Sequence, residues 1–138
     1  MWMLYALGAT LAISVSDLFR KLASSQSDPF LNNLVFQIGS IGMAIALWLL
    51  FSRKVELDST NIVYDLAGGF LIAIFTALLF KSLALGPGVS VVIPFVRVGG
   101  LVLVVLLGVV FLKEKFTGTM VLGMALALAG VYLMFSSK

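Results

Sequence analysis

The sequence contains neither cysteine nor histidine in its 138 residues. Their absence excludes disulfides, cysteine nucleophiles, zinc sites built on Cys or His, and histidine proton shuttles. Charged residues are also scarce, at 11% against about 25% in soluble proteins. Six acidic and nine basic side chains cannot cover the surface of a water-soluble domain of this length. The missing residue types exclude most familiar kinds of catalytic site, and the scarcity of charge excludes a soluble enzyme.

Hydrophobic residues make up 62% of the chain, and its mean hydropathy is +1.18. A membrane-crossing helix needs about 20 apolar residues to span about 30 Å of hydrocarbon. Five segments reach that length, and they cover residues 2–22, 30–51, 62–85, 89–112 and 118–135. The sequence therefore predicts an all-α integral membrane protein with five transmembrane helices, organised as a single transmembrane domain over 1–138. The net charge of +3 favours lipid headgroups, not nucleic acid, as partners.

Capping and turn residues mark the breaks between the spans. Asp28 followed by Pro29 is typical of a helix start, because proline's missing N–H is harmless in the first turn. The Ser-Thr-Asn run at 59–61 offers similar caps for the third span. The Gly-Pro-Gly run at 86–88 ends the third span and leaves a very short connection to the fourth.

The Lys and Arg residues are balanced between the two faces of the membrane. The face that holds the N-terminus carries Arg53, Lys54, Lys113 and Lys115, and the opposite face carries Arg20, Lys21, Lys81 and Lys138. Orientation follows an imbalance in these residues, and here none exists. The balance predicts insertion in both orientations; the alternative is that a partner chain fixes the direction.

Polar residues recur at helical spacing within three of the spans. They are Thr10, Ser14 and Asp17 in the first, Asn33 and Gln37 in the second, and Ser90 and Arg97 in the fourth, where Pro94 shares their face. Each set shares one helix face, and polar groups in hydrocarbon should face protein, water or substrate. The stripes predict a shared water-filled cavity that binds substrate. Hydrogen bonds between helices in a closed bundle are the alternative.

Two charged residues lie well inside the spans. Asp17 and Arg97 fall at matching depths, about 7 Å and 5 Å from the bilayer midplane. An ion pair between them, within one chain or across a dimer, would allow both charges to survive there. The alternative is that Asp17 pairs locally with Arg20 or Lys21, three and four residues further on.

Proline and glycine suggest mechanical roles for the last two spans. Pro94, Gly99 and Gly100 weaken the fourth span, which makes it the expected hinge. Gly123, Ala127 and Gly130 line one face of the fifth span. Small residues at this spacing permit close approach of backbones, so this face is expected to serve helix packing or dimerisation.

Several motifs together resemble a known family. They are KSLALGP at 81–87, VIP at 92–94, FLKEKFT at 111–117, Gly123, and AGV at 129–131. Together they resemble the EamA domain of the drug/metabolite transporter superfamily. The resemblance implies transport of small polar or amphipathic metabolites, and it implies ten spans built from two units of inverted topology. This chain resembles one such unit, so two copies inserted in opposite directions would rebuild the ten-helix inverted repeat.

The resulting hypothesis is a multi-pass transporter of the cell membrane that works by alternating access as an antiparallel homodimer. Its partners are a small-molecule solute, the lipid bilayer and a second copy of itself, with no cofactor and no metal. Two alternatives remain: a non-transporting membrane subunit that needs a partner chain, and a translocase for lipids or lipid-linked sugars. An enzyme is not expected, because Asp17 and Glu114 fall on opposite sides of the membrane.

Overall fold

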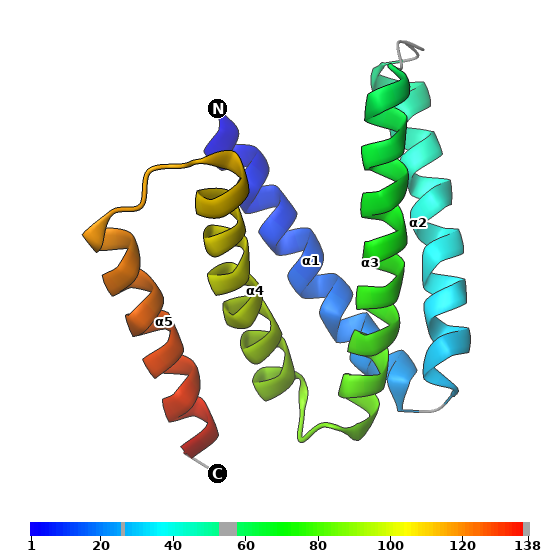
Figure 1. Ribbon diagram of the computed structural model, residues 1–138. Coiled ribbons are helices and arrows are strands. Elements are labelled where there is room, and N and C mark those ends of the chain that lie inside the picture. The colour runs from blue at the N-terminus through cyan, green and yellow to red at the C-terminus, as the bar shows by residue number, and fades with distance from the viewer. Residues whose placement is uncertain (26, 53–57, 137–138) are drawn as a thin grey trace. The chain divides into compact units, whose positions relative to one another are not determined.

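A computed structural model describes residues 1–25, 27–52 and 58–136. Its helices, labelled in Figure 1, are α1 (Trp2–Ser24), α2 (Pro29–Phe51), α3 (Ser59–Leu85), α4 (Val89–Leu112) and α5 (Gly118–Ser136). Each is long and apolar enough to cross a membrane. The prediction of an all-α protein with five such helices is confirmed. Arg53, Lys54 and Lys138, which enter the charge balance, lie outside the described residues.

Carboxylates cap the second and third helices. The Asp28 side chain accepts the N–H groups of Phe30 and Leu31, as the sequence predicts for a helix that begins at the following proline. Helix α3 begins three residues earlier than expected, so the Ser-Thr-Asn run falls inside its first turn. The Asp58 carboxylate therefore takes the capping position and accepts the Thr60 N–H.

Residues with positive φ angles lie at both ends of α4. Gly88 precedes the helix with φ at 155°, a region that side-chain-bearing residues rarely adopt. At the other end Lys113 is left-handed, with φ at 55°, and its N–H donates to the Gly108 carbonyl. The Glu114 N–H donates to the same carbonyl, so the end of α4 is closed by backbone hydrogen bonds.

The chain divides into two compact units, Met1–Leu85 and Gly86–Lys138, here called the three-helix unit and the hairpin unit. In the three-helix unit α2 packs on α3, and α1 contacts both. All of residues 1–15 are exposed, whereas the second half of α1 enters the core. That core consists of Asp17, Arg20, Ser24, Thr76, Leu79, Phe80 and Leu83. Organisation as a single domain stays a prediction.

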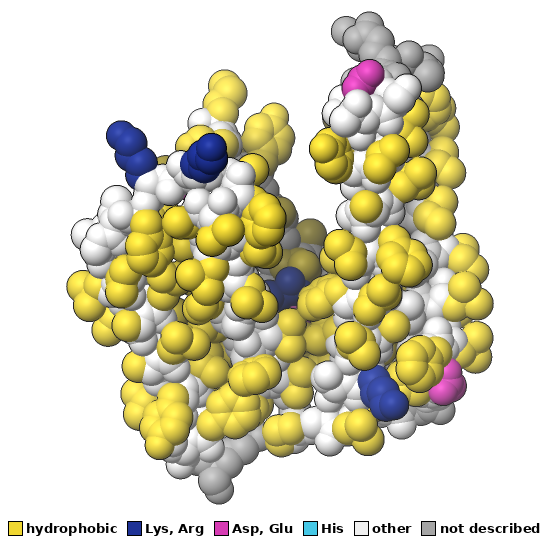
Figure 2. Space-filling view, viewed as in Figure 1, with side chains coloured by type: hydrophobic (Ala, Val, Ile, Leu, Met, Phe, Trp, Pro, Cys, Tyr) yellow, Lys and Arg dark blue, Asp and Glu magenta, His cyan; other side chains and the backbone are white. Residues whose placement is uncertain are grey.

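In the hairpin unit α4 packs against α5. The Phe95 and Phe135 rings meet edge to face with their centroids 5.8 Å apart. Val91 and Gly108 are its buried residues among those described. Figure 2 shows hydrophobic side chains covering most of the visible surface. Such a surface requires lipid or another protein against it, as expected of a membrane chain.

Candidate functional site

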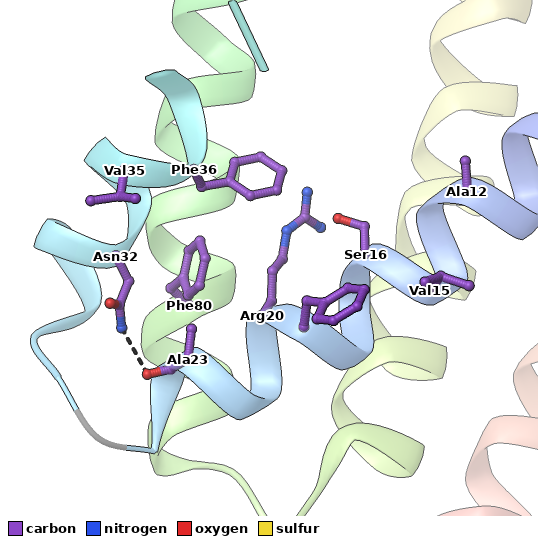
Figure 3. Close-up of a pocket in the computed structure, with 10 residues that line it drawn as sticks. Ala12, Val15, Ser16, Arg20, Ala23, Asn32, Val35, Phe36 and Phe80 are labelled. Carbon is purple, nitrogen blue, oxygen red and sulfur yellow. Dashed lines mark hydrogen bonds between the residues drawn. The ribbon is translucent and has the colours of Figure 1, made fainter. Parts of the chain in front are cut away.

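A buried ion pair lies where α1 meets α2. Arg20 and Asp17 are only 6% and 2% exposed, and the Arg20 Nη1 lies 2.6 Å from the Asp17 Oδ1. The guanidinium carbon also lies 4.3 Å from the centroid of the Phe36 ring of α2, a cation–π contact. In Figure 3 the guanidinium lies between Phe36 and Ser16. Asp17 therefore makes the local pair that the sequence left as an alternative.

A pocket of about 510 Å³ opens beside this pair (Figure 3). It is lined by Ala12, Val15, Ser16, Phe19, Arg20, Ala23, Asn32, Val35, Phe36 and Phe80. A second hollow of about 760 Å³ shares Ala12, Ser16, Val35 and Phe36 with it and continues to Leu47. The two hollows therefore form one groove between α1 and α2, here called the α1–α2 groove. The volume of each hollow is within the range of ligand pockets, roughly 300–1,000 Å³.

Two polar residues of α2, Asn33 and Gln37, face α3. The Thr76 hydroxyl of α3 is 2.6 Å from the Asn33 Oδ1 and accepts the Gln37 Nε2 at 3.0 Å. Asn33 also donates its Nδ2 to the Ala73 carbonyl at 3.3 Å. Thr76 is 2% exposed, while Asn33 and Gln37 are half-buried. These hydrogen bonds join α2 to α3, which is the interhelical arrangement that the sequence offered as the alternative to a wet cavity.

Two hydroxyls of the α1 stripe bond within their own helix. Thr10 donates to the Ala6 carbonyl at 2.9 Å, and Ser14 donates to the Thr10 carbonyl at 2.7 Å. Both residues are exposed, so this part of the stripe lies on a face that the three-helix unit leaves open. A polar face open to lipid is costly, which favours its use against substrate, water or another chain.

Lys21 connects α1 to the end of α3. Its Nζ donates to the Leu83 carbonyl at 2.5 Å, in the last turn of α3. A cation at a helix C-terminus satisfies a carbonyl that lacks an intrahelical partner and complements the helix dipole. The second half of α1 thus has three charged residues with described partners: Asp17 and Arg20 pair with each other, and Lys21 binds α1 to the end of α3.

The remaining predicted site residues belong to the hairpin unit. Ser90, Pro94 and Arg97 lie in the first half of α4, where Ser90 is exposed and the other two are half-buried. Gly99 and Gly100 follow them in the same helix, with open space around their α-carbons. Asp17 belongs to the other unit, so an Asp17–Arg97 pair stays a prediction, as does the hinge in α4.

The small-residue face of α5 has open space around it. A methyl group on Gly123 or Gly130 would meet no described atom within 4 Å. At Gly108 of α4 the situation differs, because a methyl group there would lie 2.7 Å from the Glu114 Oε2. The Glu114 side chain therefore packs back over the end of α4, in keeping with a structural role at the membrane edge. The role of the α5 face in packing or dimerisation stays a prediction.

Two central residues escaped the sequence reasoning. The sequence pattern places Arg20 in the charge balance and offers it as a neighbour for Asp17, but it does not put Arg20 in the predicted binding site, although the spacing of three residues places both on one helix face. Thr76 is an isolated hydroxyl in the apolar run of α3. A lone polar residue in such a run needs a partner, and that requirement could have pointed to the Asn33 and Gln37 stripe of α2.

Five helices that are long and apolar enough to cross a membrane define a multi-pass integral membrane protein, the class in which solute transporters fall. The chain matches the model of the EamA-like transporter family over residues 1–136 and belongs to that family. It is thus a membrane transporter of the drug/metabolite superfamily, a group of transporters, not enzymes, whose usual location is the plasma membrane. It is also 26% identical over 134 residues to an uncharacterized protein of Methanocaldococcus jannaschii, covering 96% of each chain. No solved structure matches it.

Proposed function

We propose that the protein moves small polar or amphipathic solutes across the membrane by alternating access, as an antiparallel homodimer. The observation that carries the proposal is the α1–α2 groove, a ligand-sized space with a buried ion pair at its edge, in a family of transporters. Charged groups inside a membrane are expensive and usually serve transport or ligand binding. A second copy in the opposite orientation supplies the inverted repeat that alternating access uses.

The balance of Lys and Arg supports the antiparallel arrangement. Neither face carries the excess that would fix one orientation. The exposed stripe of α1 and the open small-residue face of α5 are available to a second copy. In this proposal the α1–α2 groove admits the solute, and the rest of the path is lined by Thr10, Ser14, Asp17, Asn33, Gln37, Ser90, Pro94 and Arg97. Pro94, Gly99 and Gly100 supply the bend in α4, and Gly123, Ala127 and Gly130 supply the contact on α5.

Cysteine labelling in intact cells tests the orientation. The natural chain has no cysteine, so Ser25→Cys and Ser59→Cys each introduce a single thiol without background. Both positions are exposed, and they lie at opposite ends of the membrane-crossing helices, in the loop after α1 and at the start of α3. We expect a membrane-impermeant maleimide to label a fraction of each variant. Full labelling of one and none of the other would refute the antiparallel homodimer and indicate a partner of fixed opposite topology.

Arg97 provides a test of the path. Replacing it with alanine removes the half-buried cation of α4, and we expect transport to be lost while the dimer persists. Solute uptake into proteoliposomes measures the first, and cross-linking in membranes measures the second. Val110→Ala, at an exposed position of the same helix that is not assigned to the path, is the control and should leave uptake unchanged. Wild-type uptake in the Arg97 variant would contradict the role assigned to it.

A further inference from the structure

The depth of Arg20 makes its burial notable. Arg20 follows the middle of α1 by seven residues, which is about 10 Å along the helix. Half of the hydrocarbon core measures about 15 Å, so with α1 centred in the bilayer the Arg20 backbone lies inside the core, close to the face at which its charge is counted. Placing a guanidinium at this depth costs free energy. Because Arg20 also lines a pocket, we expect its charge to bind a ligand there.

The two charges of the ion pair are not equally accessible from the pocket. Arg20 is, among the described residues, the charged side chain that lines the pocket, while Asp17 does not line it and is 2% exposed. A molecule entering the pocket therefore meets the cation and not the anion. The guanidinium presents five N–H donors, so it can bond Asp17 and an oxygen of a ligand at the same time.

The rest of the pocket is mainly apolar. Five of the ten lining residues are phenylalanine or valine, namely Phe19, Phe36, Phe80, Val15 and Val35. Asn32 adds an amide, which already donates to the Ala23 carbonyl at 3.0 Å, as Figure 3 shows. The wall therefore suits an aromatic or branched apolar body, and the single cation suits an anionic group attached to it.

We infer that the pocket of the α1–α2 groove binds an amphipathic organic anion, with its negative group on Arg20 and its apolar body among the phenylalanines. The inference rests on the proposed function, because it names the class of solute that enters the transport path. A soluble aromatic carboxylate and the headgroup region of an anionic lipid share this chemistry. A zwitterion or a cation does not fit, since the carboxylate that would hold an ammonium group does not line the pocket.

Calorimetric titration of the purified full chain in a neutral detergent tests the site. The probe is 1-naphthoate, and its matched competitor is the 1-naphthylmethylammonium cation. We expect the anion to bind at least tenfold more tightly than the cation. The paired variant Asp17→Asn/Arg20→Gln removes both charges of the pair together, and it should weaken naphthoate at least tenfold. Lys81→Gln, which removes a cation outside the pocket, should leave the affinity within twofold.

A second pair of variants guards against misfolding of the charge variant. Phe19 and Phe70 are similarly exposed, at 66% and 69%, but only Phe19 lines the pocket. Phe19→Ala should weaken naphthoate several-fold, while Phe70→Ala should not. The inference is overturned if naphthoate fails to bind the natural chain at millimolar concentration, if the cation binds equally well, or if neither Phe19→Ala nor the charge variant changes the affinity.

Lipid nanodiscs then separate the two sources of the anion. With phosphatidylglycerol added to phosphatidylcholine, loss of naphthoate binding identifies a lipid headgroup as the occupant, and unchanged binding identifies a soluble solute. Both results support the anion site. Labelling of both engineered cysteines together with absent naphthoate binding would retain the proposed transporter and reject this site, so the two failures are distinguishable.

Discussion

Thr76 should contribute measurably to stability, because its hydroxyl is the junction between α2 and α3. Thr76→Val keeps the shape of the side chain and removes the bonds to Asn33 and Gln37. Hydrogen bonds between membrane helices contribute on average about 0.6 kcal/mol each. Two such bonds, and the Asn33 oxygen left without this donor, lead us to expect a loss of about 1–2 kcal/mol.

The assay is reversible unfolding by sodium dodecyl sulfate in mixed micelles, followed by circular dichroism. Thr10→Val is the matched control, since the Thr10 hydroxyl bonds its own helix and is exposed. It should change the free energy of unfolding by less than about 0.5 kcal/mol. A double-mutant cycle with Gln37→Leu should show a coupling of about 0.5–1 kcal/mol. Equal effects of the two threonine variants, or no coupling, would refute the junction.

Three further predictions concern the ion pair and the helix ends, and the same unfolding assay measures all of them. Asp17→Ala leaves Arg20 without this buried carboxylate and should destabilise the chain by about 3–5 kcal/mol, while the paired Asn/Gln variant should recover most of that loss; equal losses would contradict the pair. Gly88→Ala should cost about 1–3 kcal/mol because φ is 155° there, and a neutral result would exclude strain. Lys21→Met should cost about 1–2 kcal/mol through loss of the bond to the Leu83 carbonyl, whereas an unchanged midpoint would show that water replaces it.

The structure also bears on how the polar stripes are interpreted. Helical spacing correctly placed Asn33 and Gln37 on one face, but it could not say what that face meets. In the three-helix unit this face of α2 meets Thr76 of α3. The two amides therefore hold α2 and α3 together, in addition to the role in the transport path that we propose for them. The stripe of α1, by contrast, leads from exposed Thr10 and Ser14 to the buried Asp17.

The sequence by itself determined the five membrane-crossing helices and the cap at Asp28. These features are local, because the length of an apolar run must match the bilayer and a cap contacts N–H groups only two or three residues away. The family motifs are likewise readable in order along the chain. For this reason the all-α membrane architecture follows without any knowledge of how the helices pack.

Only the tertiary structure decided which partners the polar groups take. Asp17 had candidate partners in Arg20, Lys21 and Arg97; the three-helix unit shows the pair with Arg20, while a pair with Arg97 stays a prediction. The Phe36 ring beside that guanidinium comes from another helix. Which side chains meet depends on the rotation and register of one helix against another, set by packing across the whole unit. The spacing of residues along the chain shows which of them share a helix face, but it does not show which helix that face meets. The α1–α2 groove therefore could not be predicted, because it depends on how the faces of α1 and α2 lie against each other.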